Sequence, residues 1–331
     1  MRFSVGVNYR SRTGAATLWH DFDAGAVRDD LTQIATAGLD AVRIFVPWDD
    51  PRLRLDDLVQ AIDLAGAAGL RVLPSLTAAP GIGNIYEGAL LERQIAFVRA
   101  AGERVRAHPA IVAWDVGAAF SSVCAPARGK VTSGEHASEP VAERALAAWC
   151  RSLAEAVRAS SSLPATVGTT SDDLTHDNNV RLGSLCAPLA FASMQGSNVS
   201  LDFARDRTDP EAIPFLALLT AAFSFKPVLM TGFGNPGAPY YTDDENAAYC
   251  TAVLERLHAD GRLGAYWSGW PGSTSPVTAA LANFGRQART VMKAADMPMI
   301  SSTYYYRTLP LSTKTLYDAY LGFVAERRAA M

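Results

Sequence analysis

Two carboxylates that could transfer protons stand beside a tryptophan in this 331-residue sequence. Asp49 and Asp50 directly follow Trp48, and a carboxylate held against an indole ring can have a raised pKa and act as a general base. The sequence D-D-P is also a turn signal, so an ordinary loop is the alternative. Asp115 is the third candidate for a general base.

Metal, cofactor and nucleophile chemistry find little support. The five histidines form no H-x-x-x-H or E-x-x-H pattern and the four cysteines have no C-x-x-C spacing, so we expect reduced thiols and no metal site. Ser268 has no histidine placed to activate it and lies in no G-x-S-x-G elbow. No G-x-G-x-x-G turn follows the first apolar run, and we expect no cofactor.

Eight short apolar runs alternate with longer segments of helical period. The runs cover residues 4–9, 41–47, 71–76, 111–116, 165–170, 189–195, 227–232 and 264–269. The helical segments cover residues 26–37, 55–68, 90–107, 140–159, 210–223, 243–259 and 276–295, whereas the connection 171–188 is short and weakly helical. This alternation is typical of parallel βα units, and eight units predict an α/β fold with a closed (β/α)8 TIM barrel.

Length and composition fit one such domain. We expect residues 1–331 to form a single barrel, with residues 296–331 as a C-terminal helical extension that packs on it. Hydrophobic residues make up 49% and the net charge is −3, which argues against a nucleic-acid partner. No apolar stretch reaches about 20 residues and the start carries no signal-peptide pattern, so we expect no membrane partner and a cytoplasmic protein.

The active site of such a barrel lies at the C-terminal ends of its strands. The residues near these ends that could contact a ligand are Tyr9, Arg43, Trp48, Trp114, Ala118, Thr170, Gln195, Ser197, Trp267, Ser268 and Trp270. Trp48, Trp267 and Trp270 could provide flat apolar walls for a ring, although core packing accounts for Trp267 equally well. The expected partner is a small molecule, aromatic or sugar-like.

Three stretches carry a family resemblance. They resemble parts of glycoside hydrolase family 5-like, clan A barrels of the cellulase and mannanase type. The opening of such a barrel, through its second strand, is similar to GVNYRSRTGAATLWHDFDAGAVRDDLTQIATAGLDAVRIFVPWDD, its fourth strand to HPAIVAWDVGAAF, and its seventh to KPVLMTGFGNP. The resemblance implies that the general acid/base belongs at Ala119 and the nucleophile at Gly232, where the family has glutamates. It also places Ala118 where the family has an asparagine that binds the sugar 2-hydroxyl.

The same resemblance identifies Arg43 with the family arginine that hydrogen-bonds the nucleophile. Because a buried guanidinium needs an anion, we expect Arg43 to pair with Asp115, which shares the strand face of Ala119. This ion pair would have a structural role. Alternatively, Asp115 or Arg43 would be part of a site that the missing glutamates expose.

Ordinary glycosidase activity should be absent, because retaining hydrolysis needs two carboxyl groups and no glutamate stands at a strand end. Two origins would explain the missing glutamates: a natural pseudoenzyme or an engineered barrel. Acids, aromatic residues and loop lengths differ from the family together, which favours an engineered barrel. Three hypotheses follow: a remodelled scaffold with an enlarged small-molecule cavity, an enzyme with an Asp general base beside Trp, and a carbohydrate-binding pseudoglycosidase.

Overall fold

The computed structural model describes residues 3–10, 17–78, 85–86, 88–120, 139–175, 180–235, 240–288 and 312–329. Its strands are β1 (Ser4–Tyr9), β2 (Ala41–Pro47), β3 (Arg71–Thr77), β4 (Trp114–Asp115), β5 (Ala165–Thr166), β6 (Gly168–Thr170), β7 (Ala192–Gln195), β8 (Val228–Phe233) and β9 (Gly264–Trp267). They form one parallel sheet in the order β5-β4-β3-β2-β1-β9-β8-β7-β6. The two end strands, β5 and β6, are pieces of a single run separated by Val167, so the sheet closes on itself. The predicted (β/α)8 barrel is confirmed.

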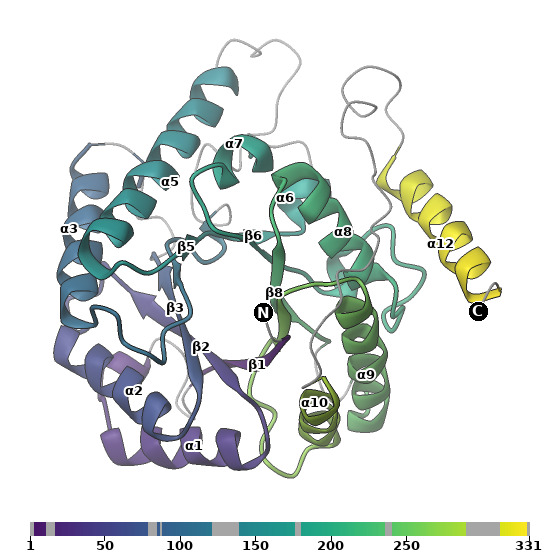
Figure 1. Ribbon diagram of the computed structural model, residues 1–331, viewed down its shortest axis with the longest axis horizontal. Helices are drawn as coiled ribbons and strands as arrows, with labels where there is room; N and C mark the ends of the chain where they lie inside the picture. The colour runs from purple at the N-terminus through teal and green to yellow at the C-terminus, as the bar shows by residue number, and fades with distance from the viewer. Residues whose placement is uncertain are drawn as a thin grey trace.

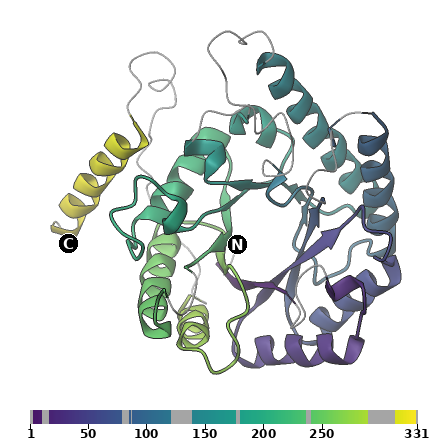
Figure 2. The ribbon, with the colours of Figure 1, turned by 180° about the vertical axis from the view of Figure 1, so that it is seen from behind.

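Helices surround this barrel on the outside (Figures 1 and 2). The long ones are α1 (Ala24–Thr36), α2 (Leu55–Ala67), α3 (Gly88–Arg104), α5 (Glu139–Ser161), α8 (Ala212–Ser224), α9 (Asp243–Ala259) and α10 (Pro276–Gln287). Two short helices, α6 (Asp172–Thr175) and α7 (Leu182–Cys186), stand in the weakly helical connection. Capping signals fix several starts: Thr242 and Glu245 form a capping box on α9, and Ser275 caps α10 ahead of Pro276.

Strand boundaries differ from the prediction mainly in the fourth and sixth runs. The fourth run was predicted over 111–116, but regular pairing covers only Trp114–Asp115, with an isolated bridge from Ile111 to Val72. The sixth run pairs only from Ala192. Apolar composition marks burial, whereas strand assignment needs continuous hydrogen bonding, and these ends lack it.

Inside the barrel, polar residues stack on an apolar layer. The apolar layer consists of Ala41, Leu73, Ala113, Phe191, Leu229 and Tyr266, all of them buried. Two residues further along five of these strands come Arg43, Ser75, Asp115, Ser193 and Thr231, which are also fully buried. Because alternate residues share a strand face, each polar side chain lies one step closer to the carboxyl ends of the strands. The sequence thus builds a polar layer just below the barrel mouth.

The last helix, α12 (Thr313–Ala329), lies outside α8 (Figure 1). Its fully buried Tyr317 packs on Phe203 and Phe215, with ring centroids 5.1 and 5.0 Å apart. Residues 296–311, which contain the predicted start of the C-terminal segment and Tyr304–Tyr306, fall outside the described residues. None of the described helices is long and apolar enough to cross a membrane.

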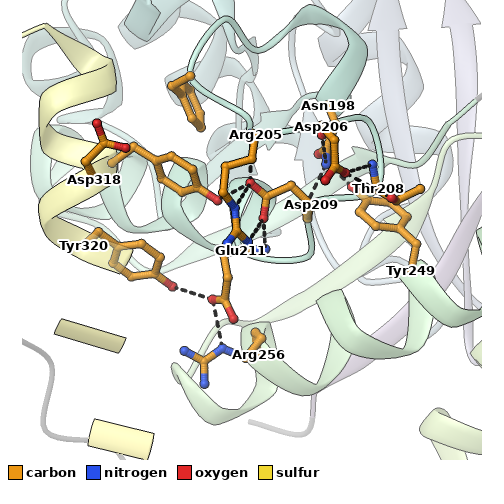
Figure 3. Close-up of polar contacts among 12 residues, drawn as sticks. Asn198, Arg205, Asp206, Thr208, Asp209, Glu211, Tyr249, Arg256, Asp318 and Tyr320 are labelled. Carbon is orange, nitrogen blue, oxygen red and sulfur yellow. Dashed lines mark hydrogen bonds and ion pairs between the residues drawn. The ribbon is translucent and has the colours of Figure 1, made fainter. Parts of the chain in front are cut away.

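A polar network fastens α12 to the chain ahead of α8 (Figure 3). We call it the anchor cluster, and it consists of Arg205, Asp209, Glu211, Arg256, Tyr317 and Tyr320. The hydroxyl of Tyr317 donates to Asp209 Oδ2 over 2.6 Å, and that of Tyr320 donates to Glu211 Oε2 over 3.2 Å. Both carboxylates also accept from arginines, so the helix is held by polar as well as apolar contacts.

Candidate functional site at the carboxyl ends of the strands

Arg43 is the centre of the polar layer, and its side chain is fully buried. Its Nη2 donates to Asp115 Oδ2 over 2.6 Å and its Nε donates to Ser75 Oγ over 2.7 Å. Its Nη1 donates to Gln195 Oε1 over 3.1 Å and to the Thr231 carbonyl over 3.2 Å. We call these five residues the mouth cluster. The predicted ion pair between Arg43 and Asp115 is confirmed.

Asp115 is occupied on both oxygens. Its Oδ1 accepts from the backbone N–H groups of Gly168 and Gly117 over 2.8 and 3.2 Å, while Oδ2 faces Arg43. A Cβ at Gly168 would lie 3.0 Å from both Arg43 Nη2 and Asp115 Oδ2, so only glycine leaves room for the pair. A carboxylate held this way lacks a free lone pair directed at a ligand, which favours the structural role over that of a general base.

Gly232 faces the interior beside Gln195 and Asn8. A Cβ there would lie 3.2 Å from Gln195 Cβ and 3.4 Å from Asn8 Nδ2. The Gln195 side chain therefore fills the space next to Gly232 and supplies Arg43 with an acceptor. Asn8 is only 4% exposed and its Oδ1 has no hydrogen-bond partner. A buried acceptor without a donor costs about 1–3 kcal/mol, and the described residues supply no donor to Asn8 Oδ1.

Ala118 and Ala119 lie at the end of the fourth strand region, where backbone hydrogen bonds hold them in place. The N–H of Ala118 donates to the Leu76 carbonyl over 2.8 Å and that of Ala119 donates to the Gly168 carbonyl over 2.9 Å. Ala119 has a φ of 50°, in the left-handed region that L residues seldom adopt. Neither methyl group can transfer a proton.

Phe45 and Arg10 form the rim above the mouth cluster. The guanidinium carbon of Arg43 lies 4.9 Å from the centroid of the Phe45 ring, and that of Arg10 lies 5.5 Å from it. Phe45 is half-buried and Arg10 is exposed. Sequence reasoning missed Phe45 and Asn8, and placed Arg10 only at the end of the first strand. The signal that could have found their common face is strand alternation, since each lies two residues beyond an inward-facing neighbour.

Several predicted ligand contacts lie in the core instead. Tyr9 is 1% exposed and its hydroxyl donates to Asp30 Oδ2 over 3.1 Å, on the α1 side of β1. Trp114 is fully buried in the hydrophobic core, and Trp48 is 6% exposed. Trp267 packs edge to face on Phe233, with ring centroids 5.1 Å apart. These side chains occupy outward positions of the strands, so neither Trp48 nor Trp267 offers an exposed wall to a ring.

The remaining predicted contacts lie near the strand ends without joining the mouth cluster. The Thr170 N–H donates to Asp173 Oδ2 over 2.8 Å, and the Ser268 hydroxyl donates to the Phe233 carbonyl over 2.9 Å. Ser197 Oγ is buried without a hydrogen-bond partner, and Trp270 is half-buried against the core. Of the predicted residues, the structure therefore brings together Arg43, Asp115, Gln195 and Gly232, with Ala118 close by at Gly168.

The expectation of a raised pKa is wrong for Asp50. Hydrogen bonds from the Arg52 side chain and backbone, and a further bond with His20 Nε2, favour the charged carboxylate and hold its pKa well below its usual value. Arg52 lies two residues after Asp50 in the same turn, and the prediction from the D-D-P pattern did not consider this arginine. Asp50 is therefore a weak base, and Asp49 is half-buried beside it.

Within the described part of the chain, no group of three or more His, Cys, Asp or Glu side chains could hold a metal ion. Cys150, Cys186 and Cys250 are buried free thiols, and burial raises the pKa of each of them. Cys124 lies outside the described residues. Such thiols are protonated at neutral pH and poor nucleophiles.

Solved structures share this architecture. A GH5_18 variant from Streptomyces cattleya in complex with Manb1-4GlcNAc superposes with a TM-score of 0.71 at 20% identity, over 88% of this chain and 82% of that one. An exo-beta-1,4-mannosidase from Opitutaceae bacterium strain TAV5 gives a TM-score of 0.71 at 19% identity, over 87% and 60% of the two chains. An endo-1,4-beta-mannanase from Rhizomucor miehei gives 0.64 at 11% identity, over 86% and 95%.

These likenesses concern the fold. This chain shares the TIM-barrel fold of these GH5_18 and mannosidase structures. No protein-family model and no curated protein matches the sequence.

Proposed function

We propose that this protein binds a carbohydrate at the barrel mouth and does not hydrolyse it. The observation that carries the proposal is the mouth cluster, in which Arg43 is satisfied by Asp115 and Gln195 while Ala119 and Gly232 carry no functional group. Retaining hydrolysis needs two carboxyl groups about 5–5.5 Å apart, one as nucleophile and one as acid/base. The mouth cluster contains a single carboxylate, and that one is committed to an ion pair.

Gln195 supports the idea that the mouth changed as a unit. In the family resemblance, Arg43 would hydrogen-bond a nucleophile carboxylate at Gly232. Here the Gln195 amide oxygen accepts from Arg43 Nη1 instead, and a Cβ at Gly232 would lie 3.2 Å from the Gln195 Cβ. A neutral acceptor thus replaces an anion without leaving Arg43 unsatisfied. This coupled change favours a remodelled barrel, natural or engineered, over piecemeal decay.

A sugar suits this mouth better than a flat aromatic compound does. Hydroxyl groups donate as well as accept, so one of them can meet the unpartnered Oδ1 of Asn8. An aromatic ligand would need exposed apolar walls, and Trp48 and Trp267 are each only 6% exposed. The general-base alternative is disfavoured by the lowered pKa of Asp50 and by the occupied oxygens of Asp115.

The test combines a binding measurement with a hydrolysis assay. We expect β-1,4-mannobiose to bind, by calorimetry or protein-observed NMR, while 4-nitrophenyl β-mannoside releases no 4-nitrophenol above the buffer rate. Asn8→Ala should weaken binding about tenfold or more, because it removes the buried acceptor. The control is His108→Ala, in a surface cavity of about 380 Å³ at the opposite, amino-terminal end of the strands.

Hydrolysis that survives in the purified protein would refute the proposal. So would mannobiose binding that is lost in His108→Ala and retained in Asn8→Ala, because the ligand would then lie at the wrong end of the barrel.

A further inference from the structure

Arg10 carries a positive charge at the barrel mouth that has no counter-charge among the described residues. Arg10 directly follows β1, is exposed, and is held with its guanidinium carbon 5.5 Å from the Phe45 ring centroid. Among the described residues it has neither a hydrogen bond nor an ion pair with a carboxylate. An aromatic ring under a guanidinium restrains the side chain and leaves its N–H donors free to meet an anion.

Strand register places Arg10 directly above the interior site. β1 and β2 pair in parallel with Asn8 opposite Arg43, so residues two further along, Arg10 and Phe45, are also neighbours. All four side chains therefore share one face of two adjacent strands. Asn8 lies deeper, next to Gly232, and Arg10 lies at the rim.

The described carboxylates nearest to Arg10 and Arg43 already have partners of their own. Arg43 is neutralised by Asp115 at 2.6 Å. Ala119 and Gly232, the strand-end positions where carboxylates would make the mouth acidic, are uncharged. Asp173, near the end of β6, is 5% exposed and accepts from the Thr170 N–H, and Asp50 pairs with Arg52 and His20. Arg10 thus has no carboxylate partner among the described residues.

We propose that the mouth selects an acidic carbohydrate, such as a uronic acid, whose carboxylate pairs with Arg10 while one of its hydroxyls donates to Asn8 Oδ1. This inference rests on the proposed carbohydrate binding and adds the charge of the ligand. A neutral sugar satisfies Asn8 alone. An acidic sugar also gains a charge-assisted hydrogen bond from a guanidinium already restrained by Phe45.

The experiment compares a β-1,4-linked dimannuronate with β-1,4-mannobiose, which has the same linkage and ring stereochemistry without the carboxylates. By calorimetry at 50 mM salt we expect the acidic disaccharide to bind about fivefold more tightly, the size expected of one exposed charge pair. The preference should shrink at 500 mM salt, because screening weakens exposed pairs. Arg10→Gln should abolish the preference, so that the two disaccharides bind this variant with equal affinity. Arg99→Gln, at an exposed position of α3, is the matched control and should keep it.

The possible failures are distinguishable. Equal affinity for the two disaccharides overturns the acidic-sugar inference and leaves the carbohydrate-binding proposal standing. A preference that survives in Arg10→Gln also overturns the inference, because another cationic side chain would then bind the sugar carboxylate. If neither disaccharide binds at all, the carbohydrate-binding proposal itself is refuted.

Discussion

Two clusters of this protein pair buried carboxylates with arginines, and they differ in what lies beside them. In the anchor cluster, Asp209 accepts from the Arg205 side chain and from Tyr317, and Glu211 accepts from Arg256 and Tyr320. The mouth cluster is equally well bonded around Arg43, but beside it Asn8 Oδ1 has no donor.

The difference separates a structural contact from a ligand site. The anchor cluster joins α12 to the chain ahead of α8, and its donors come from the protein itself (Figure 3). Beside the mouth cluster, the missing donor has to come from water or a ligand. A buried carboxylate therefore does not by itself mark a ligand site in this barrel.

The largest expected effect comes from breaking the mouth ion pair. Asp115→Ala leaves the fully buried Arg43 guanidinium without its anion, and we expect a loss of about 3–5 kcal/mol in the free energy of unfolding. Urea denaturation followed by circular dichroism measures it. We expect α12 to stay docked in this variant, because the anchor cluster shares no residue with the mouth cluster.

The matched control removes both charges. Arg43→Met combined with Asp115→Leu should recover a large part of the loss, because replacing a buried pair with apolar side chains is often close to neutral. A double variant as unstable as Asp115→Ala would show that the cost comes from repacking rather than from an unpaired charge.

A second expected effect is a pH dependence that belongs to the anchor cluster. Burial opposes the charged form of Asp209, but hydrogen bonds from Arg205 and Tyr317 outweigh it and lower the pKa from 3.8 to about 2. A lowered folded-state pKa adds stability above pH 3.8, which is lost as the pH falls towards 2. The shift corresponds to about 2 kcal/mol. The unfolding free energies of the wild type and Asp209→Asn, measured by urea denaturation from pH 6 to 2, should converge by that amount.

Tyr317→Phe sharpens this measurement. It removes one of the hydrogen bonds that lower the pKa of Asp209 and keeps the ring packed on Phe215, so the pH-dependent part should shrink without vanishing. Parallel stability curves for the wild type and Asp209→Asn across this range would contradict the assignment to Asp209.

The fold was predictable because its signals are local. Alternating apolar runs and helical segments gave eight strands, and Ala41–Pro47 and Asp243–Ala259 match the predicted bounds. The Arg43–Asp115 pair was predictable as well, since strand alternation puts both side chains inside one barrel and a buried cation needs an anion.

The rest required three-dimensional structure. Whether Gln195 turns its amide towards Arg43 depends on the space that Gly232 leaves, and no spacing in the sequence encodes that. The tryptophans were misjudged because a position near a strand end does not say which face it occupies. Helical spacing predicted α12, but its partners Asp209 and Glu211 lie more than a hundred residues earlier.

The smallest expected effect concerns backbone strain, which also distinguishes the two regions. Ala119, at the mouth, has a φ of 50°, whereas no residue from 198 to 211, where the anchor carboxylates lie, has a positive φ. Ala119→Gly should raise the free energy of unfolding by about 0.5–1 kcal/mol, because relief of the left-handed strain exceeds the entropy gained by the unfolded chain. Ala118→Gly, one residue earlier at a negative φ, should lower it by a similar amount. Thermal denaturation of the two variants side by side measures the contrast, and destabilisation by both would show that Ala119 is unstrained in solution.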